Sequence, residues 1–231
     1  MKHKALLLVV LGLAMSVTAC TAIVYRSPAL VEGAAQHQSV AVLPFEMLLT
    51  GKQPAGLTPE QLVEIEEYES VGFQTSLYYA LLDRADAGRR HRIYIQLQGV
   101  ETTNAILEEN GISIRDSWLM DPRDLAEVLG VDAVVRTQVE KTRYLSYGAS
   151  FGIDLGAAIV DEATDGKLGW LLPWGPVKTH DIWADASMLD GANGDLLWKV
   201  AVHREADWTR PANDVIAGVT RKLARKFPYQ G

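Results

Sequence analysis

The chain contains one cysteine, Cys20, so no intramolecular disulfide can support its fold. A folded domain therefore has to be stabilised by the burial of apolar side chains. The composition allows this, because 48% of the 231 residues are hydrophobic and 22% are charged, an ordinary ratio for a globular core. The length is that of one domain, or of a compact domain with an insertion.

Cys20 stands at the end of a segment that has the layout of an export signal. Met1–Lys4 is short and cationic, Ala5–Ala14 is almost wholly apolar, and small residues follow up to Cys20. This is the order of regions in a secretory signal. The apolar run is too short to be a permanent span, since a spanning helix needs about 20 apolar residues. We therefore expect residues 1–19 to be a cleaved signal peptide.

The four residues Val17-Thr18-Ala19-Cys20 resemble the bacterial lipobox, in which small residues precede a cysteine that receives diacylglycerol and becomes the new first residue. An unpaired thiol in an exported protein also requires an explanation. The alternative is an ordinary signal peptide cleaved nearby, with Cys20 as a small apolar residue. The charge, apolar core and spacing favour lipidation. A triacylated Cys20 would anchor the chain firmly, at about 0.8 kcal/mol for each buried CH₂.

The residue after Cys20 is Thr21 and not Asp. By resemblance to the sorting rules of Gram-negative lipoproteins, this implies an outer-membrane location, facing the periplasm or the cell surface, in a source that has two membranes. The net charge of −7 argues against a nucleic-acid partner, which is bound by clustered Lys and Arg. Residues 20–37 have little periodicity, and we expect them to form a lipidated tether to a domain at 38–231.

Apolar periodicities of helices and strands alternate through residues 38–231. The expected elements are a buried strand at 39–45, a helix at 58–83, a strand at 91–98, helices at 101–109 and 121–130, a strand from 133 to about 144, a hairpin from 179 to about 202 with its turn at 190–195, and a helix from 211. A loop containing Gly51, Pro54 and Gly56 joins the first strand to the first helix. Thr58 and Gln61 can form a capping box at the start of that helix.

The hairpin has the clearest pattern, because apolar residues alternate on both sides of its turn. They are Ile182, Ala184, Ala186 and Met188, followed by Leu196, Trp198, Val200 and Val202. We expect Trp198 to face the core. The element order predicts an α/β (or α+β) single domain, with a mixed sheet that ends in a C-terminal β-hairpin and is covered by amphipathic helices.

Three short segments carry a family resemblance: Val40–Phe45, Leu129–Val135, and the hairpin Ala186–Trp198. In this order they resemble the envelope lipoproteins grouped around the curli secretion channel lipoprotein and the penicillin-binding-protein activator lipoproteins. The resemblance covers most of residues 38–227. It implies a domain similar to the TolB amino-terminal domain, which acts by binding other envelope proteins or by assembling into export structures and not by catalysis.

The segment at 150–177 fits no regular element, because apolar residues are mixed with seven glycines and prolines. One interpretation is a long connection that folds back over the core. The other is an exposed apolar surface for a partner or for the membrane interface, where tryptophan is favoured. On this second interpretation the contact residues are Trp170, Leu171, Leu172 and Trp174.

The residues that could carry catalysis or bind a metal have simpler explanations. His91, His180 and His203 lack the close spacing of metal ligands, so we predict no metal site. Asp185 and Ser187 lie near His180 in sequence, yet no serine is surrounded by the Gly-x-Ser-x-Gly motif. On a strand, Asp185 and Ser187 merely share a face. Turn chemistry explains the acidic groups at 190–195, because the spacing of a calcium loop is absent.

A basic cluster ends the last helix, with Arg221, Lys222, Arg225 and Lys226. The helix macrodipole accounts for cations there, and binding of lipid head groups is the alternative.

In total we expect a non-catalytic, membrane-anchored interaction or assembly module of the bacterial cell envelope, serving secretion, surface assembly or cell-wall maintenance. It needs no cofactor, and its partners are the bilayer, through acylated Cys20, and other envelope proteins. Oligomerisation is left open, and a periplasmic hydrolase with an unrecognised site is the alternative function.

Overall fold

The computed structural model describes residues 24–30, 36–51, 58–85, 93–143, 178–207 and 209–229. Cys20 and the signal segment lie outside the described residues. So do Trp170, Leu171, Leu172 and Trp174, together with His91.

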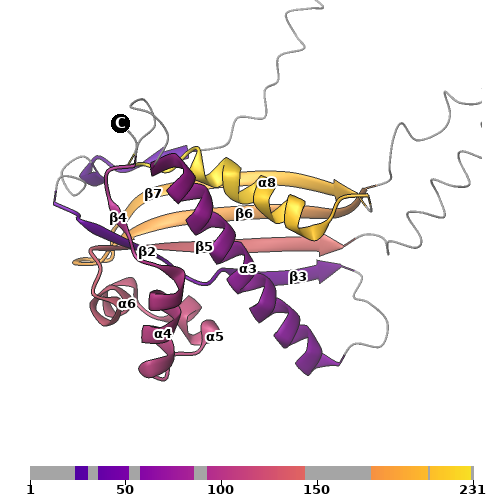
Figure 1. The fold of residues 1–231 in the computed structure, drawn as a ribbon, viewed down its shortest axis with the longest axis horizontal. Coiled ribbons are helices and arrows are strands. Elements are labelled where there is room, and N and C mark those ends of the chain that lie inside the picture. Colours follow the sequence, from indigo (N-terminus) through magenta and orange to yellow (C-terminus); the bar gives the residue numbers. More distant parts are fainter. Residues whose placement is uncertain are drawn as a thin grey trace, which may run out of the picture.

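The described strands form one mixed sheet, shown in Figure 1. They are β1 (Val24–Arg26), β2 (Ser39–Val42), β3 (Glu46–Gly51), β4 (Gln96–Leu97), β5 (Ala133–Arg143), β6 (Lys178–Asp190) and β7 (Leu196–Asp207). The order is β1-β7-β6-β5-β2-β4, and β3 pairs with β5 as well. The pairs that include β2 or β3 are parallel, and the pairs β5–β6, β6–β7 and β1–β7 are antiparallel. The prediction of a mixed sheet with a C-terminal hairpin is confirmed.

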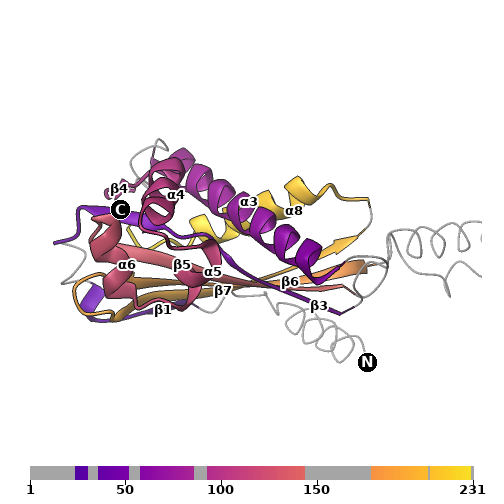
Figure 2. The same ribbon diagram turned by 90° about the horizontal axis from the view of Figure 1, so that it is seen from below.

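Helices cover both faces of this sheet. They are α3 (Pro59–Ala85), α4 (Val100–Glu109), α5 (Ile114–Leu119), α6 (Pro122–Leu129) and α8 (Ala212–Ala224). The long helices α3 and α8 lie on one face, above the larger core cluster (Figure 2). On the other face of β2 and β5, a smaller cluster joins Ala41 and Val134 to Leu107 of α4 and Leu125 of α6.

The helix ends follow the signals in the sequence. Thr58 and Gln61 form the predicted capping box, with the Thr58 N–H donating to Gln61 Oε1 over 3.0 Å and the Gln61 N–H donating to Thr58 Oγ1 over 3.3 Å. Asp121 caps α6 by accepting a hydrogen bond from the Arg123 N–H. Gly130 then ends α6 with a φ of 65°, a conformation that favours glycine.

Two elements within the predicted domain were not expected from the sequence. Residues 46–51, expected to be part of a loop, form β3, because the long strand β5 offers a free edge beyond the end of β2. The short helix α5 was not expected either, although Ser113 and Asp116 form a capping box at its start. β3 depends on a partner strand that is distant in sequence. α5 is too short to show an apolar period.

Two other expectations need correction at the sheet edges. Within the described part of the strand expected at 91–98, the ladder is limited to β4, where Gln96 and Leu97 lie beside Ser39 and Val40, and Ile93 forms a single bridge. The Tyr94 N–H instead donates to the Tyr229 carbonyl. Residues 24–26 fall in the range expected to be tether, and they form β1 on the edge of β7.

The hairpin has the predicted alternation in β6, and most of β7 follows it. A bulge between the Met188–Trp198 and Leu189–Leu196 pairs changes the register near the turn. Leu197 and Trp198 are therefore both buried, while Leu196, expected to point inward, is partly exposed. Trp198 is 1% exposed and packs edge-on against Phe227, with the ring centroids 6.0 Å apart. Its predicted inward orientation is confirmed.

We predict that Trp198→Ala lowers the free energy of unfolding by about 3 kcal/mol or more, because it removes a large aromatic side chain from a packed core. Chemical denaturation monitored by circular dichroism measures the change. Trp183→Ala is the matched control, since Trp183 is 49% exposed on the opposite face of the hairpin. An unchanged denaturation midpoint for Trp198→Ala would contradict the prediction.

The buried His180 makes stability depend on pH. The residue is 5% exposed, and its Nδ1 lies 3.0 Å from Thr179 Oγ1. Burial, together with the charges of Lys141 and Arg143, lowers the pKa of His180 to about 4. In the unfolded chain the pKa is about 6.5. Between these two values the unfolded state binds more protons, so folding is weakened as the pH falls.

We therefore expect the free energy of unfolding to fall by about 1–3 kcal/mol between pH 6.5 and pH 4 on account of His180 alone. Other groups titrate in this window, so the measurement is a comparison of denaturation midpoints for the native chain and His180→Gln across it. The midpoint of the native chain should fall more steeply. Parallel curves would show that His180 has no part in the acid sensitivity.

Candidate functional site

The contact between α3 and α8 organises the clearest surface features of the described chain. Ser76 Oγ and Thr220 Oγ1 are 2.8 Å apart where the two helices meet. One hollow lies toward the helix N-termini and another toward their C-termini. The hollows differ in chemistry, since the first is lined largely by carbon and the second by cations.

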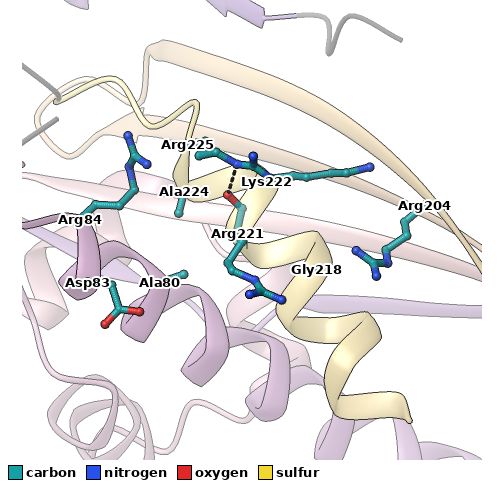
Figure 3. A pocket seen from close by; sticks show the side chains of 9 residues that line it. All are labelled: Ala80, Asp83, Arg84, Arg204, Gly218, Arg221, Lys222, Ala224 and Arg225. Atoms are coloured by element: carbon teal, nitrogen blue, oxygen red, sulfur yellow. Dashed lines mark hydrogen bonds between the residues drawn. The ribbon is translucent and has the colours of Figure 1, made fainter. Parts of the chain in front are cut away.

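We call the second hollow the basic pocket. Its volume is about 450 Å³. Figure 3 shows its lining residues, which come from α3, β7 and α8: Ala80, Asp83, Arg84, Arg204, Gly218, Arg221, Lys222, Ala224 and Arg225. Five of these side chains are cationic and one is anionic. The pocket therefore concentrates positive charge in a chain whose net charge is −7.

The helix period places the α8 cations on the pocket wall. Arg221 and Arg225 are four residues apart, so they lie on the same side of α8. Arg221 Nε donates to the Ala217 carbonyl over 3.0 Å, and Arg225 Nε donates to the Arg221 carbonyl over 3.2 Å. Lys222 Nζ donates to the His203 carbonyl of β7 over 3.0 Å. Each of these bonds uses one N–H of the charged group, and the remaining N–H groups of the guanidinium and ammonium groups can bind a ligand.

Gly218 provides the space for Arg204. A Cβ built at position 218 would lie 1.7 Å from Nη1 of Arg204, so the guanidinium rests where a side chain of α8 would otherwise be. Burial, followed by the charges of Arg210 and Arg221, lowers the pKa of Arg204, and the charge of Asp214 opposes this shift in part. Cations thus outweigh the single carboxylate that acts on Arg204.

None of Arg204, Arg221, Lys222 and Arg225 makes an ion pair with a carboxylate in the part of the chain that the structure describes. Other cations of the protein do have acidic partners: Arg115 pairs with Glu66, Lys141 with Glu69, and Arg210 with Asp207. These four side chains can therefore bind an anion without first breaking an ion pair within the described chain.

The basic cluster predicted from the sequence is only part of this pocket. Arg221, Lys222 and Arg225 line it, while Lys226 does not. Arg84 and Arg204 were missed, because they come from α3 and β7. No local sequence pattern could have linked them to α8.

The hollow on the other side of the Ser76–Thr220 contact we call the apolar groove. Its volume is about 770 Å³. Its lining residues are Glu64, Ile65, Tyr68, Glu69, Val71, Gly72, Thr75 and Ser76 of α3 with Ala212, Asn213 and Ile216 of α8. Tyr68 is 83% exposed at its rim. A groove of this kind can accept an apolar side chain from a partner.

The three residues that could have suggested a hydrolase are not brought together. His180 is buried on the side of β6 that faces the core, with Ile182 and Ala184. Asp185 and Ser187 alternate with these core residues and therefore lie on the opposite face of the strand. The constellation that would favour the hydrolase alternative is not formed by these residues.

The pairing of β6 with β7 does gather a group that the sequence analysis missed. Ligand atoms of Asp181, His203 and Glu205 lie within 4.8 Å of one another on the strand face opposite the core. His203 Nε2 contacts Asp181 Oδ1, and the imidazole stacks on Trp183 with the ring centroids 4.2 Å apart. One nitrogen and two carboxylates are chemically able to hold a divalent cation. Cross-strand neighbours of this kind have no signature of spacing within one segment.

The acidic turn at 190–195 has the backbone role expected from its composition. Asp190 Oδ1 accepts hydrogen bonds from the N–H groups of Ala192 and Asn193, over 2.7 and 3.2 Å. Gly194 has a φ of 78°, where glycine is favoured.

Among the described helices, none has the length and apolar character needed to cross a membrane.

No known protein family matches the sequence, and no curated protein matches it either. Several solved structures match the chain at low identity. Lipoprotein GNA1162 from Neisseria meningitidis is 14% identical, with a TM-score of 0.45, and the match covers 82% of this chain and 96% of that one. A PelC dodecamer from Paraburkholderia phytofirmans is 13% identical, with a TM-score of 0.44, and the match covers 89% of this chain and 95% of that one.

The C-terminal domain of LpoB from Salmonella enterica is 12% identical, with a TM-score of 0.34, and the match covers 77% of this chain and 94% of that domain. A lipoprotein is thus among the matched structures, as the sequence resemblance to envelope lipoproteins implied. At these identities and TM-scores the matches show no family membership for this chain.

Proposed function

We propose that this chain is an exported lipoprotein that acts as a non-catalytic interaction or assembly module of the bacterial cell envelope. The observation that carries the proposal is the position of its only cysteine. Cys20 directly follows a cationic segment, an apolar segment and a row of small residues, in the order that export and lipidation require. Thr21 supports an outer-membrane location in a source with two membranes.

The start of β1 gives this anchor a structural consequence. Val24 pairs with Val200 of β7, and it is only four residues after Cys20. Four residues of extended chain span at most about 14 Å. An acylated Cys20 would therefore hold the β1–β7 edge of the sheet close to the bilayer, and not at the end of a long tether.

We infer that residues 150–177 make the functional contact with another envelope protein. The supporting observation is where the chain leaves and re-enters the sheet. Arg143, at the end of β5, pairs with His180 of β6, so both ends of the intervening segment start from one end of the sheet. β3 and β7 end, and α8 begins, at this same end (Figure 1). The α/β body would thus present Trp170, Leu171, Leu172 and Trp174 from a firmly paired base.

We predict that Cys20→Ser abolishes acylation, because a hydroxyl does not replace the thiolate nucleophile that accepts the lipid. Cells labelled with radioactive palmitate should yield a labelled native chain and an unlabelled variant that is uncleaved or soluble. Thr18→Ser, which keeps a small residue in the same segment, serves as the control and should be labelled normally. Radioactive lipid on Cys20→Ser would refute the anchor.

We predict that Trp170→Ala combined with Trp174→Ala changes the free energy of unfolding by no more than about 0.5 kcal/mol, as for surface residues. The same variant should recover less partner protein by affinity capture from detergent-solubilised membranes, because exposed tryptophans contribute strongly to protein interfaces. Trp183→Ala removes a half-exposed tryptophan from the sheet, and capture should stay normal.

The contact proposal is lost if the double variant unfolds readily while partner capture remains proportional to the amount of folded protein. The segment would then be a core element. This outcome leaves the anchor at Cys20 untouched, since lipidation is measured separately.

A further inference from the structure

We propose that the basic pocket is a binding site for a phosphate group carried by a small anionic ligand. The inference is independent of the lipid anchor, because it rests on the described residues of α3, β7 and α8. Its first support is the charge of the pocket wall. Five cations surround one cavity, and Asp83 is the one carboxylate among the lining residues.

The macrodipole of α8 explains only part of this charge. Cations are favoured near a helix C-terminus, which covers Arg221, Lys222 and Arg225. Arg204 belongs to β7, and its guanidinium lies beside Gly218 near the middle of α8. It also lies close to Arg221, whose charge contributes to the lowered pKa of Arg204. Asp214 acts on Arg204 in the opposite direction, but the charges of Arg210 and Arg221 outweigh it, and like charges held together are stabilised when an anion binds between them.

The donors suit a phosphate in particular. Arginine presents a planar fork of N–H groups that matches the oxygens of a phosphate. Figure 3 shows the guanidinium groups of Arg204 and Arg221 on either side of Gly218, with Arg225 one turn further along α8. Nε of Arg221 and Nε of Arg225 are bonded to backbone carbonyls, which fixes the direction of both side chains.

Phosphate also fits the pocket by charge and size. A phosphate monoester carries close to two negative charges and three acceptor oxygens, whereas a carboxylate carries one charge and two oxygens. The excess of cations over Asp83 favours the more highly charged group. The volume of about 450 Å³ is in the range of small-molecule sites. The ligand can be a lipid head group or a soluble phosphate, which share this chemistry.

Gly218 is further evidence that the pocket is a specific structural feature and not an incidental gap between side chains. Glycine inside a helix is less stable than alanine, so a glycine at this position has a cost that its neighbours must offset. Because glycine has no side chain, the Arg204 guanidinium can approach α8 closely at position 218. Gly218→Ala would therefore move Arg204 away from α8 while improving the helix itself.

The test uses the full-length chain, purified in a non-ionic detergent at low ionic strength, and isothermal titration calorimetry. The probes are inorganic phosphate, dihexanoyl phosphatidic acid below its critical micelle concentration, and citrate. We expect saturable binding of at least one phosphate probe, with an affinity that falls as salt is added. Citrate should bind more weakly than the phosphate probe although it carries more negative charge at neutral pH, because its separate carboxylates do not present three oxygens from one centre to the arginine forks.

The variants locate the binding. Arg221→Gln removes a charge-assisted donor and should weaken binding by about tenfold or more. Gly218→Ala should weaken binding by a similar factor while its denaturation midpoint stays equal or rises, which separates loss of the site from loss of folding. Lys199→Gln is the charge-matched control, since Lys199 is exposed on the other face of β7, and binding should be unchanged.

Each outcome has a defined meaning. Binding of both phosphate probes, or of one of them, supports the site and distinguishes a lipid source from a soluble one. Equal binding of citrate would overturn the assignment to phosphate. The proposal is also overturned if neither phosphate probe saturates, or if Arg221→Gln and Gly218→Ala bind as tightly as the native chain.

Discussion

The pairing of β5 on both of its edges determines the rest of this structure. One edge is paired with β6 over the whole strand, and the other is shared between β2 and β3. The chain passes from β2 to β3 through Leu43–Phe45, where Pro44 has no N–H to donate and interrupts the ladder. Phe45 turns inward at this interruption, and it is fully buried. One proline thus divides a continuous edge into two strands and directs an aromatic side chain into the core.

The helices that form the candidate sites are positioned from this core. Phe45 stacks on Phe73 of α3, with ring centroids 5.6 Å apart, and Gln74 Nε2 donates to the Val42 carbonyl over 2.8 Å. Trp198 packs against Phe227, which follows α8. Each helix is therefore held against the sheet by an aromatic contact, and the line along which α3 meets α8 follows from those contacts. The basic pocket and the apolar groove have their locations because the sheet sets the spacing of these two helices.

The expectations that succeeded were those that depend on neighbours in sequence. The capping box of Thr58 and Gln61, the Asp121 cap with Gly130, and the alternation of β6 all involve residues a few positions apart. The failures depend on distant partners. β3 exists because β5 extends past β2, β4 is short because only Ser39 and Val40 pair with it, and Leu196 is displaced by a bulge. The same holds for the residues of the basic pocket. Its α8 cations could be predicted, because they form a cluster in the sequence. Arg84 and Arg204 could not, because only the tertiary fold brings them to the pocket.

The two proposals meet at β7. An anchor at Cys20 leads within four residues to Val24, which pairs with Val200. Arg204 is four residues further along the same strand, a distance of about 13 Å at the rise of a β-strand. A lipid-anchored chain would therefore hold the Arg204 side of the basic pocket near a bilayer surface, where phosphate groups are concentrated. A chain with a net charge of −7 would be repelled as a whole by an anionic membrane. The cations of the basic pocket, close to the anchor, would oppose that repulsion over the short distance at which salt does not screen them.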